Sequence, residues 1–395
     1  MNFPKTLISE SMKRNDKIIE YRRWFHQHAE KGFEEVETSN YIKKELVSLG
    51  YKIIEVATTG IIAILETDKP GKSVALRADM DALVMQEETG LEFASKNESR
   101  MHACGHDGHM AMLLMAAKII MENKDHLSGI LKLIFQPAEE GGGGGKIISD
   151  AGHLDDVDVI FGIHLWNIRP AGEIVILEGP VLASANAFDI TITGKGGHAA
   201  QPNLTIDPTA VTMDIYNALQ KLISREVDPL QAVVLSLPHI SAGSAHNVIP
   251  SFAKISGTLR TFDLDVCNYL LRRIEEISKG YAKAWRCECT FEPIMISYPP
   301  LNNSTEIVQA IRPLLDEPEL GKIFDNEPPS MGGEDFAFYL QKTKGAFILL
   351  GSKNDQKGLN NPHHHPKFNF DESILWKGTA IYSILAFYSS LIPTK

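Results

Sequence analysis

A change of secondary-structure pattern near residue 181 constrains the fold of this 395-residue chain more than any other feature. Before that point helix and strand signals alternate, as is typical of an α/β domain with a largely parallel or mixed sheet. From about 181 to 294 the order becomes β-α-β-β-α-β, the order of a ferredoxin-like unit. The α/β alternation then resumes. We therefore predict a discontinuous α/β domain at 1–180 and 295–395, with a complete smaller domain inserted at 181–294.

Three predicted helices carry specific expectations about how they begin or pack. The first spans about 107–124 and has Asp107 as its expected N-cap. The second spans 264–285, and the third runs without a break over 372–391. Periodicity gives the second helix a single apolar stripe. That stripe consists of Leu270, Leu271, Ile274, Ile277, Tyr281 and Trp285.

Composition and charge argue against several classes of protein. The chain carries a net charge of −11, whereas a nucleic-acid-binding protein needs a basic surface. The N-terminal stretch lacks the apolar core of a signal peptide. No apolar run reaches the roughly 18 residues that span a bilayer. Four cysteines are too few for a disulfide framework in so long a chain. We expect a cytoplasmic protein that binds neither nucleic acid nor membrane.

One short stretch, MHACGHDGH at 101–109, gathers a cysteine and three histidines. The spacing of Cys104 and His106 places two soft ligands within reach of one metal ion. The same cysteine would also serve as a thiolate nucleophile, with His106 or His109 as its base. A third interpretation is chance clustering of residues that only pack. The stretch by itself leaves all three open.

Further ligand-type side chains follow other predicted strands. They are Asp79, Asp81, Glu139, Glu140, His164 and the run His363–His365. Because ligands of open α/β sheets bind beyond the carboxyl ends of the strands, we expect these groups and the histidine-rich stretch to meet at one rim. Taken singly, each has a plainer interpretation, such as a buried core histidine or a surface charge pair. Their convergence favours a metal site, because a cysteine nucleophile would leave the glutamates and His164 without a role.

Eight motifs in order resemble one enzyme family, the metal-dependent N-acyl-amino-acid amidohydrolases. The family includes hippurate hydrolases, aminoacylase-like enzymes, N-acetyldiaminopimelate deacetylases and auxin-conjugate hydrolases. The motifs are LRADMDAL, MHACGHDGH, FQPAEE, GIHLW, GKGGHAAQP, NVIPSFAKISGTLRTF, MGGEDFAFY and HHPKFNFDE. They cover roughly residues 16–390. The resemblance implies a catalytic α/β sandwich domain that carries two metal ions, and an inserted ferredoxin-like domain that serves as lid and as the interface of a homodimer.

The resemblance also implies a role for individual positions. Glu139 matches the general base. His198 matches a lid histidine that stabilises the oxyanion, in its own chain or in the partner's site, and Asn247 and Arg260 match lid residues that hold substrate. The last ligand follows a His-x-Pro pattern, which selects His364 over His363 and His365. The implied ligands of two divalent ions (Zn, Mn, Co or Ni) are Cys104, His106, Glu140, His164 and His364.

These positions predict metal-dependent hydrolysis of the amide bond of an N-acyl-L-amino acid, with Glu139 as proton acceptor and donor. Asp79 and Asp81 are expected to support the site, one of them by orienting a ligand histidine, and we place Asp81 among the catalytic residues. Val84, Gly333 and the glycine-rich loop after Glu140 depart from the family pattern, which affects the substrate pocket rather than the ligands. Two alternatives remain: a non-catalytic metal-dependent binding protein on the same fold, and a hydrolase with Cys104 as nucleophile.

Overall fold

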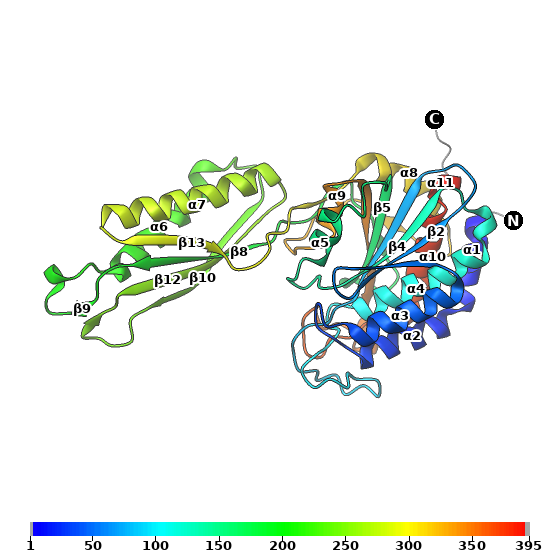
Figure 1. Ribbon diagram of the computed structural model, residues 1–395, viewed down its shortest axis with the longest axis horizontal. Helices are drawn as coiled ribbons and strands as arrows, with labels where there is room; N and C mark the ends of the chain where they lie inside the picture. The colour runs from blue at the N-terminus through cyan, green and yellow to red at the C-terminus, as the bar shows by residue number, and fades with distance from the viewer. Residues whose placement is uncertain (1–2, 392–395) are drawn as a thin grey trace. The chain divides into compact units, whose positions relative to one another are not determined.

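The computed structural model describes residues 3–391, and its backbone divides into two compact units (Figure 1). Unit 1 comprises the chain up to Val181, Asn302–Pro328 and the chain from Asp335 onward. Unit 2 comprises Leu182–Leu301 and Pro329–Glu334. The predicted fold class, an α/β domain with a ferredoxin-like insertion, is confirmed.

A mixed sheet forms the centre of unit 1, in the order β1-β2-β4-β3-β5-β16-β6-β15. In the middle of this sheet, strands β4, β3, β5 and β16 run parallel to one another. All residues of β3 are buried, as expected for a parallel strand covered on both faces. The strands are β1 (Lys52–Val56), β2 (Gly60–Glu66), β3 (Ser73–Asp79), β4 (Ile130–Gln136), β5 (Val159–Pro170), β6 (Ile174–Val175), β15 (Ile323–Phe324) and β16 (Lys344–Lys353).

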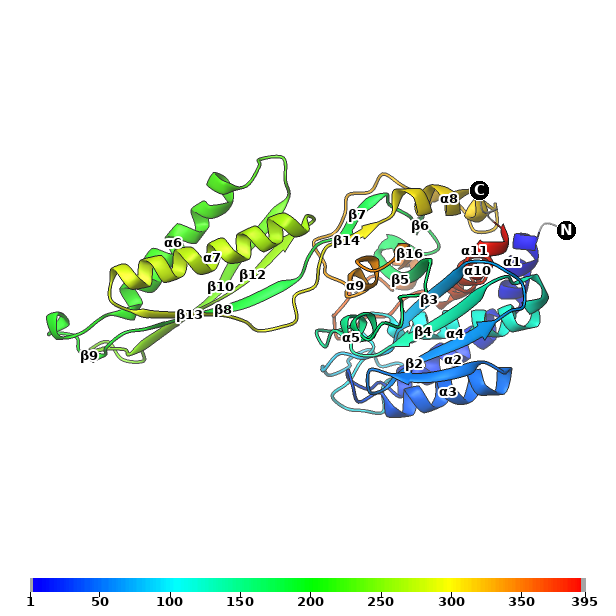
Figure 2. The ribbon, with the colours of Figure 1, turned by 45° about the horizontal axis from the view of Figure 1, so that its top comes forward.

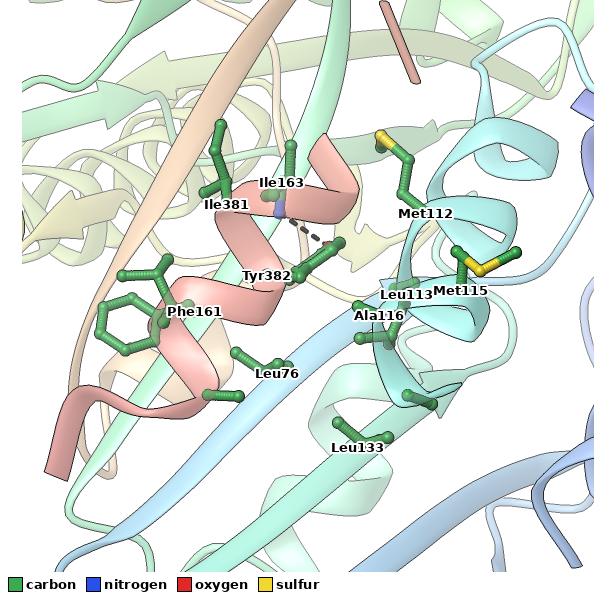
Figure 3. Close-up of a cluster of buried hydrophobic side chains, with 14 of the residues drawn as sticks. Leu76, Met112, Leu113, Met115, Ala116, Leu133, Phe161, Ile163, Ile381 and Tyr382 are labelled. Atoms are coloured by element: carbon green, nitrogen blue, oxygen red, sulfur yellow. Dashed lines mark hydrogen bonds between the residues drawn. The ribbon is translucent and has the colours of Figure 1, made fainter. Parts of the chain in front are cut away.

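Helices cover this sheet. They are α1 (Phe3–Lys13), α2 (Asn15–Gln27), α3 (Val36–Leu49), α4 (His106–Glu122), α5 (Gly144–Asp150), α8 (Thr305–Leu315), α9 (Ala337–Leu340), α10 (Leu375–Ala386) and α11 (Tyr388–Leu391). Helices α4 and α10 pack against each other and against β3 and β5 (Figure 3). Leu76 of β3, Leu113 of α4 and Ile381 of α10 are all fully buried there. Each such side chain contributes about 1.5–3 kcal/mol through burial, which makes this part of the sheet a stable base for the loops at its edge.

Strands β3 and β5 stop pairing before they end. Their last paired residues are Arg77 and Gly162. The hydroxyl of Tyr382, on α10, fills the start of the opening: it donates to the Arg77 carbonyl oxygen at 2.6 Å and accepts from the Ile163 N–H at 3.1 Å (Figure 3). A polar side chain thus satisfies backbone groups that the ladder leaves unpaired. The opening leaves room between the carboxyl ends of the two strands.

Two predicted helices differ in detail from the observed ones. Helix α4 begins at His106 with Gly105 as its N-cap, so the prediction of Asp107 as N-cap was wrong. Asp107 lies inside the first turn, fully buried, and its carboxylate binds Arg22 at 2.7 Å and His26 at 2.8 Å. The expected continuous C-terminal helix is divided into a 3-10 turn at Glu372–Ile374, then α10 and α11.

Unit 2 contains a four-stranded antiparallel sheet in the order β10-β12-β8-β13. Numbered along the chain, this order is 2-3-1-4, which is the ferredoxin-like arrangement. Helices α6 and α7 lie on one face of the sheet (Figure 2). The elements are β8 (Asn186–Thr193), α6 (Pro208–Glu226), β10 (Val233–Ala242), β12 (Phe252–Thr261), α7 (Leu264–Ala284) and β13 (Glu288–Pro293), with the short strands β9 (Gly197–His198) and β11 (Val248–Ile249) paired separately. Strands β7 (Gly179–Leu182) and β14 (Leu301–Asn303) also pair with each other.

The apolar stripe of α7 is rotated from the predicted one. Tyr281 and Trp285 are 41% and 58% exposed, so their assignment to the buried stripe was wrong. The prediction used only the spacing of large apolar residues, and this spacing does not reveal that small or weakly polar residues complete the buried face. That face consists of Cys267, Leu270, Ile274, Ser278 and Ala282.

Within residues 3–391, no helix is both long enough and apolar enough to cross a membrane.

Candidate metal centre

His109 spans the opening between β3 and β5. Its Nδ1–H donates to the Asp79 carboxylate at the end of β3 (2.6 Å), and its Nε2 accepts from the Leu165 N–H of β5 (2.8 Å). Both ring nitrogens are therefore used in hydrogen bonds, which explains why His109 does not act as a free ligand or base. Burial opposes ionisation of Asp79, but the positive charges of His106 and Arg77 bring its pKa well below the ordinary value.

Cys104, His106 and His164 come together beside this bridge. One potential ligand atom from each lies within 4.8 Å of those of the other two, and the Cys104 Sγ is 3.5 Å from the His164 Nε2. His106 donates through Nδ1 to the Asp81 carbonyl oxygen at 2.8 Å, and His164 donates through Nδ1 to the Leu165 carbonyl oxygen at 2.6 Å. Because carbonyls only accept, both rings keep Nε2 as the nitrogen available to a metal ion.

The two adjacent glutamates are held by one carboxylate. The Asp81 side chain accepts from the Glu139 N–H at 2.9 Å and from the Glu140 N–H at 3.0 Å. Glu140 joins Cys104 in a second group of close ligand atoms, and both glutamates join His106 in a third. Asp81, predicted as part of the catalytic machinery, thus fixes the backbone on which the glutamates stand.

The three consecutive histidines of the last loop have different surroundings. His364 has its Nε2 3.2 Å from the Glu140 Oε1, and the pKa of its ring is raised by that carboxylate. His363 accepts from the Asn167 N–H through Nε2, and His365 accepts from the Lys367 N–H through Nδ1. His364 is therefore the histidine that joins the others, and its backbone N–H donates to the Ala103 carbonyl oxygen next to Cys104.

We call the five residues Cys104, His106, Glu140, His164 and His364 the ligand cluster. Its electrostatics suit a cation. Burial works against a charged His106, but Asp79, Asp81 and Glu140 raise its pKa to about 10, so the surroundings favour positive charge there. Burial and neighbouring imidazoles lower the pKa of His164 well below its usual range, which keeps it neutral, as a ligand must be. The His106 Nε2 is buried without a hydrogen bond to any residue in the described part of the chain. A mixed thiolate, imidazole and carboxylate set fits a divalent transition metal.

The predicted substrate residues lie in unit 2. His198 is exposed on β9, opposite Val248 of β11 in the ladder. Asn247 directly precedes Val248 and is exposed as well. The pairing of β9 with β11 therefore brings His198 and Asn247 to one place. Arg260 stands on the larger sheet, half-buried on β12, with a guanidinium nitrogen 3.5 Å from the Ser184 carbonyl oxygen.

Sequence reasoning missed a buried ionic network beneath the ligand cluster. Arg77 of β3 binds Asp79 at 2.7 Å, Gln136 at 2.9 Å and Asp335 at 2.9 Å. Asp335 also accepts from the Gly145 N–H at 2.8 Å. The available signal was an arginine inside an otherwise apolar strand, because a buried charge requires partners.

Residues 75–387 match the model of peptidase family M20/M25/M40. Thermostable carboxypeptidase 1 of Saccharolobus solfataricus is 38% identical over 394 residues, 98% of each chain. The IAA-amino acid hydrolase ILR1-like 2 of Arabidopsis thaliana is 41% identical over 94% of this chain and 84% of its own. A solved structure of the Bacillus subtilis YXEP protein, described as a dinuclear metal-binding peptidase of the M20 family, is 34% identical with a TM-score of 0.80 and covers 94% of this chain and 97% of its own.

The chain therefore belongs to peptidase family M20/M25/M40. It is a metal-dependent hydrolase of amide bonds, which confirms the resemblance seen in the motifs and the class of enzyme predicted from it.

Proposed function

We propose that this enzyme hydrolyses the amide bond of N-acyl-L-amino acids and releases a carboxylic acid and a free amino acid. The observation that carries the proposal is the ligand cluster with a second glutamate, Glu139, directly beside it and held by the same carboxylate. A purely binding protein has no use for a base at that position. Relatives named for hydrolysis of amino-acid conjugates and of N-acetyl-L-cysteine support the substrate class.

The ligand cluster would hold two divalent ions, with Zn, Mn, Co and Ni all compatible with its donors. Such ions supply Lewis acidity toward a water molecule and a carbonyl group. Cys104 acts as a ligand in this proposal and not as a nucleophile. Its neighbours are an imidazole at 3.5 Å and the Glu140 and His364 ligand atoms, rather than an isolated histidine base.

Glu139 performs the proton transfers. Its carboxylate accepts a proton from the water that attacks the amide carbon, and it returns this proton to the nitrogen as the carbon–nitrogen bond breaks. Asp81 keeps the Glu139 backbone in place. Glu139 itself is only 7% exposed, which favours a stable orientation of its side chain. His198 donates to the developing oxyanion, and Asn247 and Arg260 bind the amino-acid part, with Arg260 suited to an α-carboxylate.

We also propose that 181–294 acts as a lid and as the interface of a homodimer, while the remainder is the catalytic domain. The four cysteines are free thiols, which supports a cytoplasmic location.

Hydrolysis of N-acetyl, N-benzoyl and N-succinyl amino acids tests the proposal, after removal of metal and after addition of Zn, Mn, Co or Ni. Activity should vanish with chelation and return with at least one ion. An N-blocked dipeptide belongs in the same screen, because a relative is named a carboxypeptidase and the bond cleaved has the same chemistry. Full activity in metal-free protein would contradict the proposal and favour Cys104 as nucleophile. Metal binding without hydrolysis of any of these compounds would favour a binding protein.

A further inference from the structure

Glu35 carries a buried carboxyl group. It is not a member of the ligand cluster, and it takes no part in the proposed proton transfers. Its side chain is 0% exposed. It occupies the N-cap position of α3 but does not cap that helix. Glu30 does so instead, because its carboxylate accepts from the Val36, Glu37 and Thr38 N–H groups. Helix capping, the ordinary role of a polar side chain at this position, therefore does not explain Glu35.

The Glu35 side chain reaches the turn that carries the two adjacent glutamates. Its Oε1 accepts from the Ala138 N–H at 2.9 Å, and its Oε2 accepts from the Thr59 hydroxyl at 2.5 Å. Together with the two bonds to Asp81, three consecutive backbone N–H groups, at 138, 139 and 140, are each held by a buried carboxylate. Two carboxylates thus determine where the turn lies.

The turn needs such support because its backbone is strained. Ala138 has φ +54°, a left-handed conformation that costs a residue with a side chain about 1–2 kcal/mol. Two glycines, Gly32 and Gly142, pack closely against Ala138. A Cβ added at Gly32 would lie 2.8 Å from the Ala138 Cβ, and one added at Gly142 would lie 2.6 Å from it. Strain of this kind persists only when the surroundings enforce it.

We propose that Glu35 is a positioning residue for the Glu139–Glu140 pair. By accepting a hydrogen bond from the Ala138 N–H, Glu35 fixes the strained residue that precedes the pair. Glu140 then keeps its place in the ligand cluster, and Glu139 keeps its place beside that cluster. This inference rests on the proposed function for the roles of the two glutamates. It adds the N-cap residue of α3 to a site built from strand ends, the loops beyond them and the start of α4.

The electrostatics of Glu35 agree with a role in positioning. Burial, followed by the charge of Asp81, raises the pKa of Glu35 to about 7. A buried carboxyl group whose pKa is raised by burial and by a neighbouring carboxylate does not stabilise the fold by its charge. What the site requires is an acceptor for the Ala138 N–H and a partner for Thr59, and a glutamine offers both.

The test compares Glu35→Ala and Glu35→Gln with the wild type by chelator competition for Zn and by kcat and KM for the best N-acyl amino acid. Asp158→Ala is the matched control. The Asp158 carboxylate also accepts a backbone N–H, that of Ser73 at 2.8 Å, at the opposite end of β3 from Asp79. Loss of a partner that orients metal ligands costs about 10–100-fold in metal affinity or activity. We expect that loss in Zn affinity and in kcat for Glu35→Ala, with KM unchanged. Glu35→Gln and Asp158→Ala should stay within about threefold of wild type.

Wild-type Zn affinity in Glu35→Ala would overturn the proposal. An equal loss in Glu35→Gln would also overturn it, because charge rather than hydrogen bonding would then be the cause. So would an equal loss in Asp158→Ala. If Glu35→Ala does not fold, Glu35→Asp replaces it under the same criteria, since its shorter side chain cannot reach both partners. The Zn measurements need no substrate. Failure of the wild type to hydrolyse any acyl amino acid therefore counts against the proposed function and leaves this inference to be judged on metal affinity.

Discussion

The ligand cluster of unit 1 and the substrate-type residues of unit 2 are built in opposite ways. Around the cluster, His106, His109 and His164 are buried, Glu140 is partly buried and His364 is exposed. Most of these side chains are oriented by another residue: His109 by Asp79, and His106 and both glutamates by Asp81. In unit 2, His198 and Asn247 are exposed on short strands and a loop. The difference indicates that the metal centre is preorganised, as metal-assisted hydrolysis requires. Because His198 and Asn247 are exposed, we expect them to contribute little to the stability of their own unit.

The largest expected effect separates the adjacent glutamates. Glu139→Gln should retain metal and lower kcat by about 10²–10⁴, because it removes the proton acceptor but no ligand. Glu140→Gln should lose metal affinity first. Metal content measured beside kcat for both variants checks this. A near-normal kcat in Glu139→Gln would contradict the assignment.

A second experiment tests whether the buried bridge stabilises unit 1. His109→Leu keeps a similar volume but leaves the Asp79 carboxylate and the Leu165 N–H without this partner. Buried groups that lose hydrogen bonds cost about 1–3 kcal/mol each, so we expect roughly 3 kcal/mol lower stability in urea unfolding. His126→Leu, at an exposed position of unit 1, is the control and should change stability by less than about 0.5 kcal/mol. An equal loss of stability in His109→Leu and His126→Leu would contradict a stabilising role for the buried bridge.

A third experiment examines the exposed side of the comparison. His198→Ala should lower kcat by about 10²–10³-fold through loss of an oxyanion donor, while the melting temperature stays unchanged because the side chain is exposed. A clear fall in melting temperature would show a structural role instead.

The same variant tells whether His198 serves its own chain or a partner. Inactive His198→Ala is mixed with inactive Glu139→Ala under conditions that exchange subunits. If His198 acts in a partner's site, half the dimers at statistical exchange hold one intact site, and activity returns to about a quarter of wild type. Demonstrated exchange without recovery would mean that it acts in its own chain or has no catalytic role.

The smallest expected effect concerns pH. The pKa of Glu35 in the folded protein is about 7, above the ordinary value of 4.5, so the folded state binds more protons between those values. Its contribution to stability is therefore fully present below about pH 4.5 and is lost as pH rises through 7. Metal-free Glu35→Gln should gain about 1–3 kcal/mol relative to wild type between pH 5 and pH 8, measured by urea unfolding. A constant difference across that range would contradict this.

The sequence predicted the elements better than their packing. Alternation and the β-α-β-β-α-β order predicted both folds, and the strand ends predicted that Glu140 and His164 would each lie near Cys104. The prediction of Asp107 as the N-cap of α4 was wrong because its carboxylate forms a buried ion pair with Arg22. The α7 stripe was rotated because Ser278 and Ala282, rather than Tyr281, fill the buried face. Arg77 carried a signal, because it is an arginine inside an apolar strand, but its partners Gln136 and Asp335 are distant in sequence. Glu35 carried no such signal, and its partners Thr59 and Ala138 are distant as well.

We propose that the metal centre belongs to unit 1 alone, and metal stoichiometry tests this most directly. Wild-type protein saturated with Zn and freed of excess should contain about two ions per chain. Cys104→Ala and Glu140→Gln should contain fewer, whereas His198→Ala and Arg260→Ala should keep the full number. Full occupancy in Cys104→Ala and Glu140→Gln, or loss of metal in the unit 2 variants, would contradict the account.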